Sequence, residues 1–149
     1  MYLELMVIPI REELTRMGIT ELRTAADVDR ELAVGHGTTL VVVNSICGCA
    51  AGRMRPALRT ALEHSSRPDR LFSVFAGQDL EATERARSYF TGYPPSSPSL
   101  ALFRNGKLTH MIERSDIEHR DASDLATELK RAFDENCARS VSTGGGRGN

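Results

Sequence analysis

The chain has 149 residues, of which 40% are hydrophobic and 26% charged, and its formal net charge is −1. This length fits one domain with a real core, and the small net charge excludes a basic field for a nucleic-acid partner. The N-terminus carries Glu4 and no basic segment before an apolar run. Even the longest apolar runs, such as residues 40–43, are far shorter than the roughly 20 residues of a membrane helix. We therefore expect a cytoplasmic protein with no membrane partner.

The first part of the chain is predicted to fold into a helix, a strand and a second helix. Apolar residues recur at helical spacing after Pro9, which predicts a short helix with this proline in its first turn and Gly18 beyond its end. Residues 19–23 are predicted as an edge strand. Thr24, with Asp27 three positions later, resembles a capping box and predicts the start of the second helix.

Residues 38–46 give the clearest pattern in the sequence. They form a β-branched, nearly continuous apolar run, typical of a strand that is covered on both faces in a parallel sheet. This strand leads directly into Cys47. A helix is predicted after Cys49, with Pro56 at a kink or a late start, and residues 71–76 are predicted as a third strand.

The second half of the chain is predicted to end in a hairpin and a helix. A helix is expected to open at Asp79, and the proline-rich residues 93–98 can only be a loop. Strands are predicted at residues 100–103 and 108–112, because an Asn-Gly dipeptide between them indicates a type I′ hairpin. A last helix is capped by Asp121.

This order of elements predicts the fold class. Alternating strands and helices give parallel pairing, and the closing hairpin adds antiparallel edges. We therefore expect an α/β fold: a thioredoxin-like three-layer α/β/α sandwich with a mixed sheet and an extra N-terminal helix. Residues 1–139 are assigned to this single domain. The Ser/Gly-rich residues 140–149 are predicted to be a flexible tail.

The most informative motif is the Cys-Gly-Cys turn. Cys47 stands where the predicted central strand ends and a helix begins, and a helix N-terminus favours a thiolate over a thiol. Closing a disulfide to Cys49 makes a small ring, for which Gly48 supplies backbone angles closed to other residues. Such a bond is expected to be strained and easily reduced. Asn44 and Ser45 are expected to hydrogen-bond the turn or the thiolate, or to cap the helix.

Two other interpretations of the cysteines stay open. They are two buried, inert side chains, or they belong to a non-catalytic module that binds a metal or an iron–sulfur cluster. Such a site needs about four ligands, and beyond the pair the chain has only Cys137 and four scattered histidines, so we expect no metal unless two chains share it. Cys137 itself is expected to pack in the core, with a second resolving thiol as the alternative.

Three segments resemble one known family. Residues 44–52, with the sequence Asn-Ser-Ile-Cys-Gly-Cys-Ala-Ala-Gly, are similar to the active-site segment of the bacilliredoxins, and residues 93–99 and 133–137 also resemble that family. The resemblance implies a thioredoxin-like fold and removal of bacillithiol from mixed disulfides on cytosolic proteins. It also implies disulfide isomerase activity. Bacillithiol or a similar small thiol is then a co-substrate, and no cofactor is bound.

The resemblance also implies residue roles. Cys47 corresponds to the attacking thiol and Cys49 to the nearby second thiol. Pro98 matches the proline that thioredoxin-like proteins hold in cis, facing the redox turn, so we expect a cis bond after Ser97 and contact between Pro98 and the Cys47 sulfur. Ser97 would then present its backbone to a substrate chain. The chain departs from ordinary thioredoxins in two ways: one residue, not two, separates the cysteines, and Ile46 stands where those proteins have tryptophan.

Overall fold

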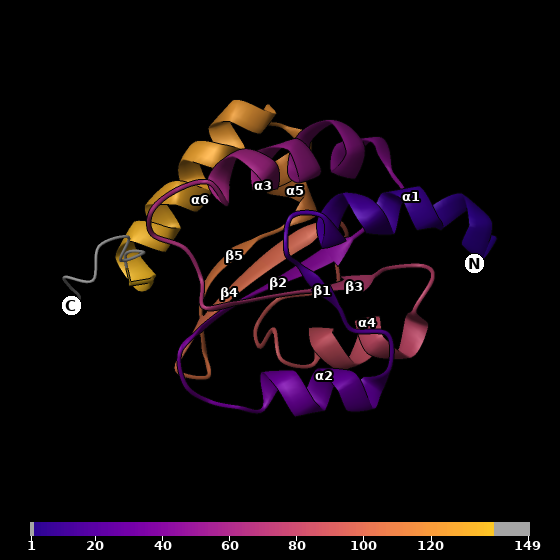
Figure 1. Cartoon of the computed structure of the whole chain (residues 1–149), viewed down its shortest axis with the longest axis horizontal. Helices are drawn as coiled ribbons and strands as arrows, with labels where there is room; N and C mark the ends of the chain where they lie inside the picture. The colour runs from indigo at the N-terminus through magenta and orange to yellow at the C-terminus, as the bar shows by residue number, and fades with distance from the viewer. Residues whose placement is uncertain (1, 139–149) are drawn as a thin grey trace.

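The computed structural model describes residues 2–138, which form a three-layer α/β/α sandwich (Figure 1). Within these residues a mixed five-stranded sheet has the order β1-β3-β2-β4-β5. β1 and β3 run parallel to β2, whereas β4 pairs antiparallel with both β2 and β5. The strands are β1 (Thr20–Glu21), β2 (Thr38–Asn44), β3 (Arg70–Phe75), β4 (Ser99–Arg104) and β5 (Lys107–Ile112).

Helices cover both faces of the sheet (Figure 1). One face packs against α1 (Glu4–Thr15), the π-helical segment η1 (Ala50–Met54), α3 (Arg55–Ala61), α5 (Arg114–Glu118) and α6 (Ala122–Asn136). The other face packs against α2 (Ala25–Leu32) and α4 (Leu80–Arg87). The predicted fold class is therefore confirmed. None of the helices within residues 2–138 combines the length and hydrophobicity needed to cross a membrane.

β2 is the centre of the molecule. All seven of its residues are buried, because β3 and β4 flank it and a helical layer covers each face. Its β-branched residues suit this position, since they pack well on a pleated surface that is covered on both sides. The strand ends at Asn44, two residues before the predicted end. The chain then has only a short turn in which to reach the first cysteine.

Several turn and cap predictions are confirmed. Asn105 and Gly106 have φ values of 53° and 80°, the left-handed conformation that a type I′ hairpin requires. The Asp121 side chain accepts a hydrogen bond at the start of α6, as predicted. The Thr24 hydroxyl accepts the backbone N–H of Asp27, but the Asp27 carboxylate accepts from Arg23 rather than from Thr24 itself.

The predicted start of the first helix is wrong. α1 begins at Glu4, so Pro9 lies in its interior. A proline there has no N–H to donate, which leaves the carbonyl of Leu5 without its helical partner. Leu5 is 80% exposed, so this turn of the helix faces solvent. The buried residues of this helix, Val7, Arg11 and Leu14, begin before the proline and include a charged side chain, which a hydrophobic pattern does not count.

The structure contains one helix that was not predicted, and the role of Asp79 also differs from the prediction. α5 was not predicted; Glu113 and Asp116 form a capping box at its start. Asp79 precedes α4 as predicted, but its carboxylate does not cap that helix and binds Arg11 instead. The expected flexible tail, residues 140–149, lies outside the described residues.

Arg11 joins α1, β1 and the start of α4. Its side chain is only 5% exposed, and its guanidinium pairs with Glu4 at 2.8 Å and with Glu21 and Asp79 at 2.7 Å each. The guanidinium also lies 5.1 Å from the ring centroid of Phe75. A buried cation is stable only when its partners compensate for lost hydration, and here three carboxylates from three elements do so.

We predict that Arg11→Met lowers the free energy of unfolding by about 3–5 kcal/mol, because the mostly buried Asp79 carboxylate loses its buried partner and keeps the half-exposed Arg23, 3.7 Å away. Urea unfolding at pH 7 measures this loss. Arg11 also holds the pKa of Glu4 below its usual value through a hydrogen bond. The wild-type protein therefore loses that contribution as the pH falls below about 4, and the difference between the two proteins narrows there.

The matched control is Arg16→Met. It removes an arginine that follows the same helix, is 75% exposed and, among residues 2–138, pairs with Glu12 alone. It should cost less than about 0.5 kcal/mol. Equal losses for the two variants would contradict a special role for Arg11.

Candidate active site

The central strand positions the cysteine pair. Two residues separate the end of β2 from Cys47, and the helical segment begins immediately afterwards, with η1 starting at Ala50. Both Cys47 and Cys49 are free thiols, half-buried against the larger core cluster. The backbone N–H groups of Ala50 and Ala51 each donate to the Cys47 carbonyl at 3.1 Å. The structure thus places Cys47 at a strand end and a helix start, as predicted.

The Cys47 thiol lies among groups that favour its ionised form. Partial burial raises its pKa, but a hydrogen bond with the Ser45 hydroxyl, the N–H groups of Ala50 and Cys49, and the charge of Arg114 lower it, and the net pKa is below the ordinary value. The Ser45 hydroxyl also accepts the backbone N–H of Cys47 at 3.2 Å. Ser45 therefore performs both roles that the sequence left open, binding the turn and binding the thiol.

Arg55 fixes the turn that precedes Cys47. Its side chain is 3% exposed, and it donates to the Asn44 side-chain oxygen at 3.1 Å and to the Ser45 carbonyl at 2.9 Å. A third bond, 2.5 Å long, joins it to Glu13 of α1. Asn44 in turn accepts the Ser45 N–H at 2.9 Å. Asn44 thus acts as part of this support, and the Arg55 guanidinium is bound by Glu13, Asn44 and Ser45.

Gly48 does not need its special freedom in the dithiol form. It is exposed, its φ lies outside the left-handed region, and no atom lies within 4 Å of the position that a Cβ would take. An alanine would fit there without strain. The role expected for this glycine concerns the closed Cys47–Cys49 ring, and it stays a prediction.

The loop before β4 forms the second wall of the site. The Ser97–Pro98 bond is cis, which confirms the prediction, and Pro98 is buried. Ser99 pairs with Val43, so Pro98 lies beside the strand end that leads to the cysteines. Within residues 2–138 the backbone N–H of Ser97 donates no hydrogen bond. Contact between Pro98 and the Cys47 sulfur stays a prediction.

Two arginines hold this loop by its carbonyl groups. Arg87 of α4 donates to the Ser96 carbonyl at 3.2 Å, and Arg114 of α5 donates to the Ser97 carbonyl at the same distance. The backbone N–H of Arg114 also reaches the Ser96 hydroxyl at 3.4 Å. The loop is therefore fixed from both sides of the sheet.

Arg114 is the site residue that the sequence did not identify. It is the first residue of α5, which packs against η1, and its charge acts on both Cys47 and Cys49. It lies far along the chain from the cysteines, in a segment without a clear hydrophobic period. The one local signal was Asp116 three positions after Glu113, which indicates a helix start.

Cys137 lies at the opposite end of β2 from the redox turn. It is buried in the core cluster and its thiol is hydrogen-bonded to Thr38, the first residue of the strand. Burial raises its pKa to about 11. Its place in the core cluster confirms the predicted core packing. The seven residues of β2 separate Cys137 from the redox turn by about 20 Å, which excludes attack of Cys137 on Cys47 within one chain.

Among the described residues, no group of three or more His, Cys, Asp or Glu side chains forms a metal site.

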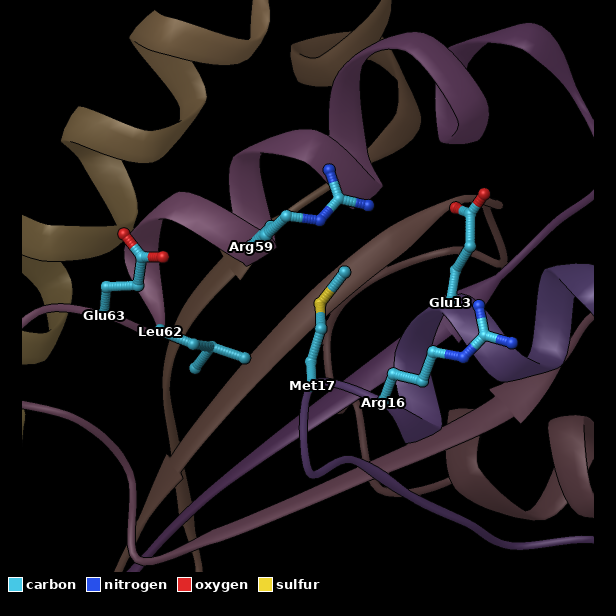
Figure 2. A pocket seen from close by; sticks show the side chains of 6 residues that line it. All are labelled: Glu13, Arg16, Met17, Arg59, Leu62 and Glu63. Atoms are coloured by element: carbon cyan, nitrogen blue, oxygen red, sulfur yellow. The ribbon is translucent and has the colours of Figure 1, made fainter.

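One open cleft lies away from the cysteines. About 430 Å³ of open space lies between the ends of α1 and α3 (Figure 2), lined by Glu13, Arg16, Met17, Arg59, Leu62 and Glu63. Its lining contains two cations, two carboxylates and no cysteine. Because the cysteines precede α3 and the cleft borders the other end of that helix, the cleft is not the reaction site.

Known proteins resemble this chain over most of its length. A family model described as disulphide isomerase matches residues 2–137. A bacilliredoxin of Koribacter versatilis is 59% identical over 137 residues, covering 92% of this chain and 94% of that protein. A bacilliredoxin of Geobacillus kaustophilus is 49% identical, with 91% and 94% covered.

Solved structures show the same fold. The protein Trxlp from Edwardsiella tarda has a TM-score of 0.51 at 24% identity, covering 75% of this chain and 99% of that one. Mitochondrial thioredoxin 3 from Saccharomyces cerevisiae has a TM-score of 0.53 at 17% identity, with 79% and 95% covered. The fold is therefore thioredoxin-like.

We predict that alkylation of Cys47 follows a pH profile whose midpoint lies below the free-thiol value of about 8.5, because the thiolate is the reacting form. Ser45→Ala removes one hydrogen bond to that thiolate, so its midpoint should move upward. Mass analysis of the Cys47 peptide after timed alkylation measures both profiles. Ser115→Ala, an exposed serine beside Arg114, serves as the control and should leave the midpoint unchanged. A midpoint that Ser45→Ala does not move would contradict this account of the thiol.

Proposed function

Since the chain belongs to the bacilliredoxin family of thiol–disulfide oxidoreductases, we propose that it removes a small thiol from mixed disulfides on other proteins, with Cys47 as the attacking residue. The expected small thiol is bacillithiol or a similar molecule, and the expected clients are S-thiolated cytosolic proteins. The observation that carries the proposal is the half-exposed Cys47, whose thiol is stabilised as a thiolate at the end of the central strand.

The proposed reaction consists of two disulfide exchanges. The Cys47 thiolate attacks the sulfur of the small-thiol cap, so the bond between client and cap breaks, a bond between Cys47 and the cap forms, and the client leaves as a thiolate that takes up a proton. In the second exchange the attacker is either Cys49, which leaves a Cys47–Cys49 disulfide, or a free small thiol, which restores Cys47 and carries the disulfide away. One disulfide is consumed and one formed in each step.

Ser97 is proposed to align the client. Its backbone N–H is unused within the described chain and lies beside the strand end that leads to Cys47. A backbone carbonyl of an extended client segment would accept a hydrogen bond from this N–H, as when a strand is added to the edge of a sheet. The same chemistry acting on a wrongly paired protein disulfide would give isomerase activity, which we propose as a secondary activity.

We predict that the two cysteine variants differ in the species that accumulates. Mixed with a capped client, Cys49→Ser should accept the cap and retain it on Cys47, because no neighbouring thiol displaces it. Cys47→Ser should accept nothing and leave the client capped. Intact mass of both partners after mixing shows which occurs. The opposite result, with the cap held by Cys47→Ser, would assign the attack to Cys49.

We further predict that Gly48→Ala selectively weakens the Cys47–Cys49 disulfide. The dithiol form has room for the methyl group, so its stability should change by less than about 1 kcal/mol, whereas closing the small ring needs backbone freedom that alanine lacks. Titration against a small-thiol redox buffer, followed by mass measurement, gives the disulfide equilibrium. The matched control is Gly52→Ala, an equally uncrowded site outside the ring. An equal shift in both variants would remove the special role of Gly48.

A further inference from the structure

Arg114 lies between the two walls of the reaction site. α5, which it begins, packs against η1 on the side of the cysteines, and its guanidinium donates to the carbonyl of Ser97 on the side of the loop. A mixed disulfide under attack by Cys47 occupies the space between these walls. Any group a few bonds away from the attacked sulfur therefore comes close to this cation.

Some N–H donors of the Arg114 guanidinium make no hydrogen bond within the described residues. Within the described residues its side chain donates one hydrogen bond to Ser97 and one to Glu118, out of five N–H donors. The Glu118 pair is 3.4 Å long with both side chains exposed, and such pairs are weak and readily exchanged. Arg11 and Arg55 differ in this respect, because their guanidinium groups are buried and held by several partners.

We propose that Arg114 binds a carboxylate on the small-thiol cap and so makes the protein selective for negatively charged caps. This inference rests on the proposed function. A guanidinium binds a carboxylate through two parallel hydrogen bonds, which fixes orientation as well as distance. A cap held in this way presents its own sulfur to Cys47 rather than the client's sulfur. The first exchange then releases the client and leaves the cap on Cys47.

A second effect of Arg114 must be separated from this one. Its charge also stabilises the Cys47 thiolate, and losing that effect slows attack on every cap by the same factor. Recognition of a carboxylate, in contrast, changes the rate only for caps that carry one. The charge of the cap therefore distinguishes a specificity residue from one that only activates the thiol.

The test uses the full-length reduced protein and one single-cysteine client capped with 3-mercaptopropionate, 2-mercaptoethanol or cysteamine, which are anionic, neutral and cationic. Quenched intact mass gives the rate of cap transfer and the species formed on Cys47. We expect the wild-type protein to prefer the anionic over the neutral cap by about 10-fold, the size of one charge-assisted hydrogen bond. High salt should reduce this preference, because the site is partly exposed.

Arg114→Gln should abolish the preference, and Arg114→Lys should retain part of it, since the charge remains without the planar fork. Arg16→Gln, an exposed arginine on another helix, should behave as wild type. Equal slowing of all three caps by Arg114→Gln, or a wild-type protein without preference, would overturn the inference while leaving the proposed function intact. Absence of transfer from every cap to Cys47 would overturn both.

Discussion

The burial of one guanidinium at the junction of strand and helix determines much of this structure. Arg55 must satisfy its charge inside the protein, and it does so with Glu13 from α1 and with Asn44 and Ser45 from the end of β2. These bonds fix where the strand ends and where the helix after it runs. Because Ser45 is one of the partners, the contacts that stabilise the fold also place a hydroxyl beside Cys47.

Groups from three separate segments meet at the candidate site. The redox turn supplies backbone N–H groups and Ser45, the loop before β4 supplies a cis proline and an open backbone edge, and α5 supplies a cation. Cys47 and Cys49 are only two residues apart, yet the hydrogen bonds of the turn converge on Cys47. This asymmetry gives a physical basis for assigning different roles to two neighbouring thiols.

Local signals made a large part of this predictable from the sequence. The β-branched run of β2, the Asn105-Gly106 turn and the position of Cys47 after the central strand each depend on neighbours in the chain, and each was predicted, although β2 ends two residues early. The start of α1 and the role of Arg114 were missed. Both depend on charges that meet only after folding: Arg11 finds carboxylates on other elements, and Arg114 reaches the thiols from the far side of a hairpin.

The third cysteine, Cys137, can be used to measure how fast the core around it opens. The Cys137 thiol is covered by the core and protonated at neutral pH, so an alkylating reagent modifies it only when that core opens. The redox pair is accessible in the folded state and reacts on the timescale of its own chemistry. A single labelling time course therefore contains two separate records, an early one of the reactivity of Cys47 and Cys49 and a late one of the opening of the core around the end of α6.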